Sequence, residues 1–177
     1  TITHSGLFPD DLTPKYFLKA LSQFIKKNPE AKAKIKSVFI GIMRKSYLKM
    51  IKKLDLADVV ELKGYLPHYA CIEEMMKSDV LWMMAPNEIV TPSRLFEYIG
   101  AQKPILISIP EGNIRQTAID TGAAMATSHN KIPEIIEAID YFYNAWKQGK
   151  LPTPNVKYAE SFERKRLATM LARELAF

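Results

Sequence analysis

The chain lacks the features that mark several large classes of protein. Its 177 residues contain a single cysteine, Cys71, so an internal disulfide is excluded and a reducing compartment fits. No apolar run approaches the ~18 residues of a membrane-spanning helix, and no secretory signal opens the chain. Because 47% of the residues are apolar and 25% are charged, we predict one globular domain in the cytoplasm.

Several catalytic motifs are also missing from the sequence. It contains no G-x-G-x-x-G fingerprint and no Walker loop, which counts against dinucleotide and P-loop chemistry. The three histidines, His4, His68 and His129, do not have the spacing of a metal site, and no Asp-x-Asp pair is present to hold Mg²⁺. No G-x-S-x-G elbow supports a serine nucleophile. We therefore predict no metal and no cofactor.

Basic residues are unevenly distributed along the chain. Residues 1–53 hold twelve Lys or Arg and three Asp or Glu, whereas the other 124 residues hold thirteen and sixteen. A solvated helix face explains this excess, and so does a surface that contacts anionic lipid or a polyanionic substrate. No RNA- or DNA-reading motif is present, so we predict no nucleic-acid partner. Peripheral contact with the inner face of a membrane stays open as an alternative.

Short apolar runs alternate with amphipathic segments over most of the chain. The expected strands are Thr1–Gly6, Val38–Ile42, Val59–Tyr65, Val80–Ala85, Ile105–Ile109 and Ala124–Thr127. The expected helices open at Thr13-Pro14 and after Thr91-Pro92, and cover Ser46–Leu54, Tyr69–Lys77, Asn113–Asp120, Lys131–Gln148 and Tyr158–Leu175. Near-continuous apolar strands indicate a parallel sheet. We predict an α/β fold: a Rossmann-like, doubly wound parallel sheet of about six strands with helices on both faces.

The proline-containing linker at 149–155 suggests a division of the chain. Residues 1–150 form the expected Rossmann-like domain, and residues 151–177 form a linker and a closing amphipathic helix. The chain begins at Thr1 without an initiator methionine, so we interpret it as a fragment of a longer protein.

The segment 87–100 is the most informative part of the sequence. It leaves a buried strand and enters a helix, for which Thr91 is a good N-cap and Pro92 suits the first position. The amides of Ser93, Arg94 and Leu95 then lie in the first turn, where the helix dipole favours an anion. Glu97 follows one turn later. A pyrophosphate on the amides and a ribose on the carboxylate would fit this arrangement.

Other candidate residues follow the ends of the first three strands. Gly6 allows a ligand to approach the backbone closely. Arg44 and Lys45 follow the second strand, where they either hold a second phosphate or belong to the general basic surface. Tyr65 follows the third strand, where it either flanks a base or packs as an ordinary loop residue.

The stretch Val90-Thr91-Pro92-Ser93-Arg94-Leu95-Phe96-Glu97-Tyr98-Ile99-Gly100-Ala101-Gln102-Lys103-Pro104-Ile105-Leu106 resembles the donor-binding half of a GT-B glycosyltransferase of the family-4 type. The family motif is similar to P-S/G-K/R-L-x-E-Y-x-A-x-x-K-P-I-L. The first strand ending in Gly6 agrees with this resemblance, as do Phe39-Ile40-Gly41, Gly64-Tyr65-Leu66-Pro67-His68 and Ser78-Asp79-Val80-Leu81.

The resemblance implies a retaining transfer of a sugar from a nucleoside-diphosphate donor, without a bound metal. The carboxylate that matches Glu97 then holds the ribose hydroxyls, and the helix start at Ser93, Arg94 and Leu95 meets the pyrophosphate. Arg44 or Lys45 stabilises charge on the leaving diphosphate. The partner domain is an N-terminal GT-B domain that this chain does not contain.

The sequence departs from the family pattern at two places. A glutamate that the family often carries eight positions before the ribose-binding one is Ile89 here, and Glu88 is the catalytic candidate that could replace it. No basic residue stands between Gly6 and Thr13, where many members have one. A non-catalytic nucleotide-binding or scaffold domain and a GT-B nucleotide-sugar epimerase therefore remain as alternatives.

Overall fold

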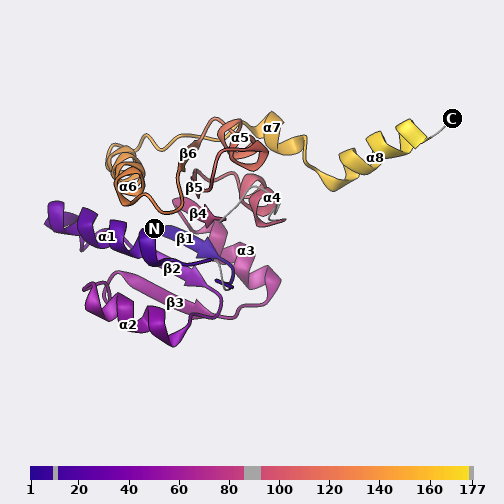
Figure 1. Ribbon diagram of the computed structural model, residues 1–177. Coiled ribbons are helices and arrows are strands. Elements are labelled where there is room, and N and C mark those ends of the chain that lie inside the picture. The colour runs from indigo at the N-terminus through magenta and orange to yellow at the C-terminus, as the bar shows by residue number, and fades with distance from the viewer. Residues whose placement is uncertain (10–11, 86–92, 176–177) are drawn as a thin grey trace.

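A six-stranded parallel sheet forms the centre of the molecule, with the strand order β3-β2-β1-β4-β5-β6 (Figure 1). The computed structural model describes residues 1–9, 12–85 and 93–175. The strands are β1 Ile2–Ser5, β2 Ser37–Ile40, β3 Val60–Gly64, β4 Val80–Met84, β5 Ile105–Ser108 and β6 Ala124–Thr127. The helices are α1 Lys15–Lys27, the 3-10 turn η1 Pro29–Ala31, α2 Lys45–Lys53, α3 His68–Met76, α4 Ser93–Gly100, α5 Asn113–Ile119, α6 Ile132–Lys147, α7 Val156–Glu160 and α8 Arg164–Leu175.

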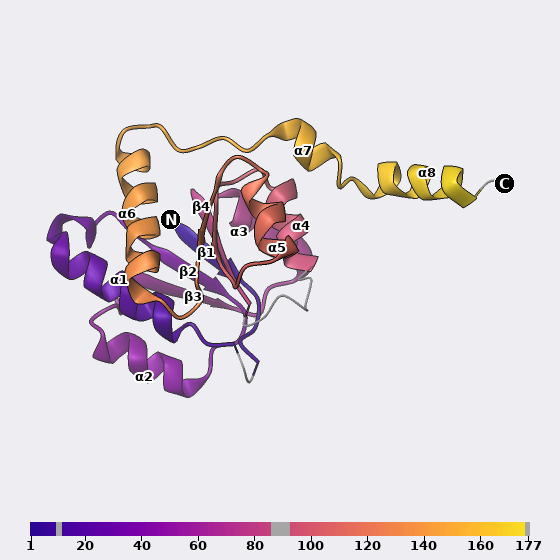
Figure 2. The ribbon, with the colours of Figure 1, turned by 45° about the horizontal axis from the view of Figure 1, so that its top comes forward.

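Helices cover both faces of this sheet (Figure 2). One core lies between the sheet and α1, α2 and α6, and a second core lies between the sheet and α3, α4 and α5. The predicted doubly wound α/β fold is confirmed, because the strand order runs outward from β1 on one side and from β4 on the other. All residues of β1, β2, β4 and β5 are buried. The apolar runs of β2, β4 and β5 predict this burial, whereas β1 also buries Thr3, His4 and Ser5.

The helix α1 illustrates how sequence pattern becomes packing. Its start is stabilised by the Thr13 hydroxyl, which accepts a hydrogen bond from the Lys15 amide at 3.3 Å. Its buried stripe faces the first core, where Phe24 meets Tyr143 of α6 with ring centroids 5.4 Å apart. Its last turn carries Lys26 and Lys27, whose charges suit the negative end of the helix dipole.

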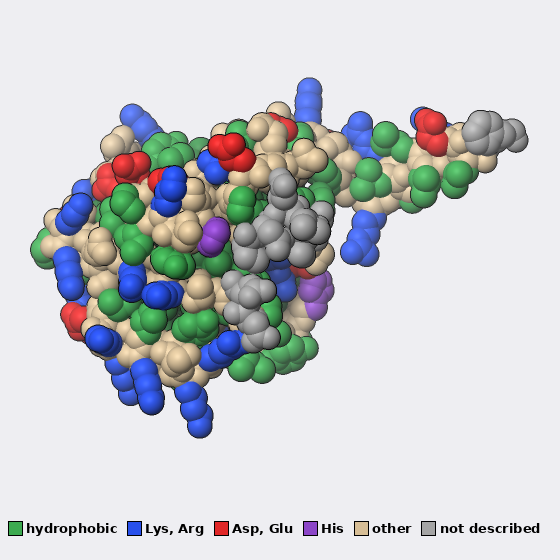
Figure 3. Space-filling model, viewed as in Figure 1, with side chains coloured by type: hydrophobic (Ala, Val, Ile, Leu, Met, Phe, Trp, Pro, Cys, Tyr) green, Lys and Arg blue, Asp and Glu red, His purple; other side chains and the backbone are tan. Residues whose placement is uncertain are grey.

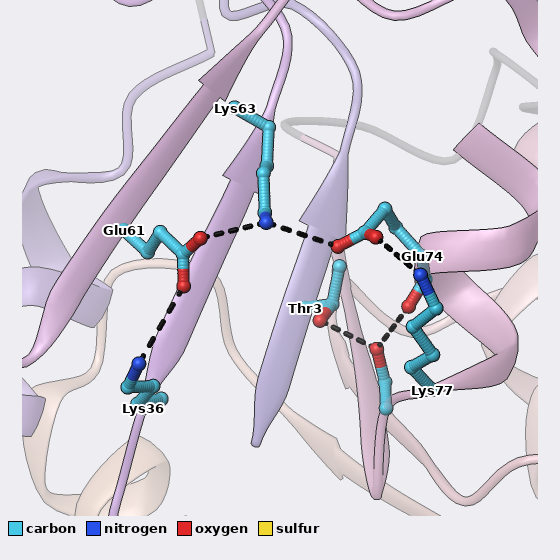
Figure 4. Close-up of polar contacts among 7 residues, drawn as sticks. Thr3, Lys36, Glu61, Lys63, Glu74 and Lys77 are labelled. Atoms are coloured by element: carbon cyan, nitrogen blue, oxygen red, sulfur yellow. Dashed lines mark hydrogen bonds and ion pairs between the residues drawn. The ribbon is translucent and has the colours of Figure 1, made fainter. Parts of the chain in front are cut away.

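A chain of ion pairs connects the outer strand β3 to α3 (Figure 4). Lys63 bridges Glu61, at 2.7 Å, and Glu74, at 3.3 Å. Lys36, in the loop before β2, approaches Glu61 at 3.8 Å, and Lys77 approaches Glu74 at 2.8 Å. The two bridging hydrogen bonds raise the pKa of Lys63, and the hydrogen bond from Lys77 is the main cause of the lowered pKa of Glu74. These ion pairs thus join β3, α3 and the residue that precedes β2.

The prediction of one closing helix over Tyr158–Leu175 is wrong. The structure has two helices, α7 and α8, separated by a turn at 161–163. Phe162 in this turn packs on Phe96 of α4, with ring centroids 5.2 Å apart. This tertiary contact interrupts the helix, although the sequence on both sides keeps helical periodicity. α8 then extends away from the body and has no buried residue (Figures 1 and 2).

Lys and Arg side chains crowd the lower part of the molecular surface, over α2 (Figure 3). The exposed lysines of this helix are Lys45, Lys49, Lys52 and Lys53. Within the described residues, no helix is both long and apolar enough to cross a membrane. The structure therefore places four lysines of this basic excess on one exposed helix, α2.

Candidate functional site

The central strands β1 and β4 part before they end. They pair only at Ile2 with Val80 and at Thr3 with Leu81. On their other sides, β1 stays paired with β2, and β4 with β5, to their last residues. A crevice therefore opens between β1 and β4, at the point where the strand order reverses. Doubly wound sheets bind their ligands at this topological switch point.

Two side chains bridge the strands where the backbone pairing stops. The carbonyl oxygen of Trp82 in β4 lies 3.1 Å from Nδ1 of His4 and 3.2 Å from the hydroxyl of Tyr98 in α4. The same Tyr98 hydroxyl accepts a hydrogen bond from the Ser5 amide at 2.9 Å. Side chains thus replace the missing strand-to-strand hydrogen bonds, which buried backbone groups require.

The protonation of the two bridges follows from their partners. Tyr98 receives one hydrogen bond and donates one, and its burial raises the pKa of the phenol. A carbonyl oxygen can only accept, so Nδ1 of His4 carries the hydrogen and Nε2 keeps its lone pair. Burial is the main cause that lowers the pKa of His4 to about 4, and the positive charge of Arg94 lowers it further. His4 is therefore neutral at pH 7.

Aromatic rings hold His4 in place on the α1 side of the sheet. The imidazole stacks on Phe8, with centroids 4.5 Å apart, and tilts against Trp82 at 5.0 Å. Phe17 of α1 stacks on the ring of Trp82, with centroids 4.0 Å apart. The ring of His4 is therefore fixed in orientation by packing and by its hydrogen bond.

Glycines occupy the carboxyl ends of the first three strands. Gly6 has φ +149°, Gly41 has φ +131° and Gly64 has φ +64°. A methyl group on Gly41 would lie 2.3 Å from the carbonyl oxygen of Gly6, so this pair is in direct backbone contact. Gly6 also donates its amide hydrogen to Ile40 at 2.9 Å. The end of β1 is thus held rigidly beside β2.

A pocket lies at the crevice, over the ends of β1 and β4. It is lined by His4, Ser5, Gly6, Leu7, Phe8, Leu12, Met83, Met84, Ser93 and Arg94. The structure therefore brings three sequence-predicted site residues, Gly6, Ser93 and Arg94, to one place. Ser93 and Arg94 stand in the first turn of α4, as expected, whereas the proposed cap residues Thr91 and Pro92 lie outside the described residues.

Glu97 borders a second hollow beside this pocket. That hollow lies between α4 and the C-terminal segment and is lined by Ser93, Phe96, Glu97, Phe162, Arg164 and Leu167. Nη1 of Arg94 lies 2.7 Å from the Glu97 carboxylate, and both side chains are partly buried. Ser93 faces both hollows, so the first turn of α4 and this ion pair connect them.

The remaining predicted residues are spread around the same edge of the sheet. Leu95 is fully buried, so only its backbone could contact a ligand. Tyr65 follows β3 and is 78% exposed. Arg44 and Lys45 are exposed at the start of α2, beyond β1, and are not among the described residues that line the crevice pocket. Glu88 lies outside the described residues.

Sequence analysis did not assign roles to His4 and Tyr98. Only tertiary structure reveals that they share the Trp82 carbonyl, because they are 94 residues apart in the chain. The one available signal was a histidine inside the predicted first strand, two residues before Gly6. In the described part of the chain, no group of three His, Cys, Asp or Glu side chains is placed to hold a metal ion.

Solved structures share the fold of this chain at low sequence identity. The pneumococcal O-GlcNAc transferase GtfA in complex with UDP and GlcNAc has a TM-score of 0.70 at 17% identity, covering 98% of this chain and 34% of that one. Anabaena Alr3699/HepE in complex with UDP has a TM-score of 0.72 at 13% identity, covering 99% and 48%. WaaG, a glycosyltransferase of lipopolysaccharide biosynthesis, has a TM-score of 0.69 at 14% identity, covering 99% and 47%.

This chain thus spans between about a third and a half of these larger proteins. A comparison with curated proteins finds no match. The sequence profile described as "Glycosyl transferases group 1" matches residues 6–161, which include Gly6, the first turn of α4 and its ion pair, whereas His4 and Ser5 lie just before this range. With a switch-point pocket in a doubly wound sheet and a profile match over most of its length, the chain belongs to the group 1 glycosyl transferase family.

Proposed function

We propose that this chain is the donor-binding half of a retaining glycosyltransferase that takes a sugar from a nucleoside-diphosphate sugar. The observation that carries the proposal is the first turn of α4, where Ser93 faces both the crevice pocket and the hollow beside Glu97. Membership of the family supports it. UDP in the structures of GtfA and HepE makes UDP the first nucleotide to test.

In this proposal the diphosphate binds at the first turn of α4. The amides of Ser93, Arg94 and Leu95 and the positive end of the helix dipole attract its oxygens. Glu97 accepts hydrogen bonds from the two ribose hydroxyls. Arg94 allows a carboxylate and a diphosphate to lie close together, because its guanidinium is already paired with Glu97 at 2.7 Å and compensates the repulsion.

Transfer requires stabilisation of the departing diphosphate. As the bond from the sugar to the phosphate breaks, negative charge grows on the phosphate oxygens, and fixed cations and amides lower the energy of that state. We assign this role to Arg44 or Lys45, and a role at the sugar to Glu88. The acceptor then enters from an N-terminal domain outside this chain, against which residues 151–177 pack. The chain alone is inactive, and the intact protein works in the cytoplasm.

Calorimetric titration with UDP tests the binding step. We expect the chain to bind UDP weakly, and Glu97→Gln to weaken this binding about tenfold or more, because a ligand hydroxyl loses a charged acceptor. Glu97→Gln should also remove the preference for UDP over 2′-deoxyuridine diphosphate. The control is Glu137→Gln, an exposed change on α6. Equal discrimination of the two nucleotides by wild type and Glu97→Gln would remove the ribose role of Glu97.

Product analysis of the intact protein tests the transfer step. With a nucleotide sugar labelled at the anomeric carbon, NMR should show a product whose anomeric configuration equals that of the donor. An inverted product would contradict retention, and a changed nucleotide sugar without transfer would identify an epimerase. Binding without any turnover would favour the scaffold alternative.

A further inference from the structure

His4 has a hydrogen-bonding nitrogen that the fold does not use. Its Nδ1 is engaged with the Trp82 carbonyl, while Nε2 is buried without a partner among the described residues. Leaving a buried polar atom unpaired costs about 1–3 kcal/mol, so most such atoms are satisfied. Because the ring also lines the crevice pocket, a ligand in that pocket is the natural partner for this nitrogen.

Gly6 provides the access. A methyl group at this residue would lie 3.4 Å from Nε2 and 3.9 Å from Cε1 of His4, so the space above the imidazole edge is the space that a side chain would fill. The glycine cannot shift easily to cover the nitrogen, because its carbonyl is in contact with Gly41 and its amide is bonded to Ile40. Because Gly6 has no side chain, no Cβ lies over Nε2, and this buried nitrogen stands directly behind the backbone that lines the pocket.

The chemistry of this nitrogen selects the ligand group. With Nδ1 protonated, Nε2 is a neutral acceptor. Arg94 lies at the same pocket, and its charge disfavours protonation of the ring. A diphosphate oxygen has no hydrogen to donate, whereas a hydroxyl does. In the proposed donor complex the ribose hydroxyls belong to Glu97 in the second hollow, which leaves the hydroxyls of the transferred sugar for the crevice pocket.

We propose that Nε2 of His4 accepts a hydrogen bond from a hydroxyl of the donor's sugar, which makes the crevice pocket over Gly6 the sugar subsite. This inference rests on the proposed function. It assigns His4 a role in choosing among sugars, because a sugar that lacks this hydroxyl or holds it elsewhere leaves the buried nitrogen unpaired.

Nitrogen-15 NMR of histidine-labelled chain tests the contact directly. The probes are UDP, UDP-glucose and UDP-N-acetylglucosamine. We expect the Nε2 signal of His4 to keep its neutral, unprotonated form with UDP, and to move in the direction of an accepted hydrogen bond with a UDP-sugar that binds. His68 and His129 serve as internal references in the same spectrum.

Two variants separate the contact from the structural role of His4. His4→Asn keeps a donor near Nδ1 for the Trp82 carbonyl but removes the acceptor at Nε2, whereas His4→Gln places an amide near Nε2. UDP binding by each variant reports whether the pocket keeps its shape, because UDP carries no sugar for Nε2 to contact. His4→Asn should bind the UDP-sugar about three- to tenfold more weakly, the range of one neutral hydrogen bond, and His4→Gln should recover part of that loss.

The outcomes distinguish this inference from the proposed function. If wild type binds none of the three probes, the proposed function fails for uridine nucleotides and this inference fails with it. If UDP binds but no UDP-sugar binds, or a UDP-sugar binds with the His4 signal unchanged, the function stands and the sugar subsite is overturned. Protonation of Nε2 on binding UDP alone would also overturn it, because the imidazole would then be a phosphate donor. The wild-type spectra decide the question even if a variant fails to fold.

Discussion

His4 and Tyr98 both bridge β1 and β4, from opposite faces of the sheet. Tyr98 uses its only polar side-chain atom in doing so, whereas His4 does not use both of its ring nitrogens. Both reach the Trp82 carbonyl where β1 and β4 part. Tyr98 also binds the Ser5 amide, so its single hydroxyl is fully engaged. His4 keeps a spare nitrogen at a pocket. The difference shows how a structural polar residue can be told from a candidate binding residue.

The rest of the α3 side follows the pattern of Tyr98. Ser78 lies 2.6 Å from the Thr3 hydroxyl and 3.0 Å from the Glu74 carbonyl. Since the carbonyl can only accept, Ser78 donates to it and Thr3 donates to Ser78. The Ser5 hydroxyl lies 2.8 Å from the sulfur of Cys71. These polar groups are paired inside the fold, and we assign them no ligand.

Gly41→Ala should lower the free energy of unfolding most, because it disturbs the end of β1, beside both bridging side chains. The new methyl group would lie 2.3 Å from the Gly6 carbonyl, at a φ of +131° that alanine rarely adopts. We expect a loss of about 3 kcal/mol or more in the free energy of unfolding, because backbone strain and overpacking add. Urea unfolding measures it.

The matched control for this change is Gly100→Ala at the end of α4, where an added methyl group meets nothing within 4 Å. It should be neutral, or stabilising by up to about 1 kcal/mol. Similar losses for the two variants would show that the contact between Gly6 and Gly41 does not constrain the end of β1.

The pH dependence of stability should sharpen the comparison between the two bridging side chains. Only His4 titrates in the acidic range, whereas Tyr98 does not. The pKa of His4 is about 4 in the folded chain and about 6.5 when unfolded. As pH falls from about 6.5 to 4, the unfolded state gains a proton that the folded state does not hold, so roughly 3 kcal/mol of stability is lost. Urea unfolding at several pH values measures this loss.

The reference for the pH experiment is His4→Phe, which keeps a ring but cannot titrate. Protonation of carboxylates with lowered pKa, such as Glu74 and Glu134, also reduces the free energy of unfolding in acid, but it does so equally in both proteins. The difference between wild type and variant should therefore shrink as pH falls through this window. Parallel curves would contradict the burial of a neutral His4.

Tyr98→Phe should have a smaller effect and removes one bridge alone. It leaves the buried Ser5 amide without its 2.9 Å acceptor, which costs about 1–3 kcal/mol. His4 continues to hold the Trp82 carbonyl. Tyr69→Phe, at a tyrosine that is 75% exposed, should change stability by less than about 0.5 kcal/mol. An equally small effect of Tyr98→Phe would mean that the hydroxyl is not needed where the strands part.

Glu74→Gln should give the smallest effect, because it acts far from the crevice, on ion pairs that water screens. We expect a slight drop in Tm that disappears at about 0.5 M salt, where charges are screened over a few ångströms. Glu73→Gln on the same helix is the control, since Glu73 forms no ion pair within the described residues. A large drop that persists in salt would show that Figure 4 depicts a main stabiliser of α3.

Much of the fold could be predicted from local pattern. Ala124–Thr127 was predicted with its observed bounds, and the other strands were placed to within one or two residues. The pattern failed at 161–163, because Phe162 turns toward Phe96 of a helix 66 residues away. It also missed the short turn Pro29–Ala31 after α1. Local sequence patterns carry no information about contacts between residues that are distant in the chain.

The candidate site was only partly accessible to sequence reasoning. Gly6, Ser93 and Arg94 were predicted and meet at one pocket. Glu97 was expected to share their crevice, and the structure puts it at the neighbouring hollow, joined through Arg94. Its ribose role stays a prediction, as do the roles of Arg44, Lys45 and Tyr65. Glu88 lies outside the described residues.

The sequence by itself determined the class of this protein: apolar strands alternating with amphipathic helices dictate a covered parallel sheet, and the stretch around Arg94 and Glu97 indicates the family. Only the tertiary structure decided which polar groups form hydrogen bonds within the fold and which remain available to a ligand. Hydrogen-bond satisfaction is a property of three-dimensional neighbours, so the spare nitrogen of His4 becomes visible only when β1, β4 and α4 stand side by side.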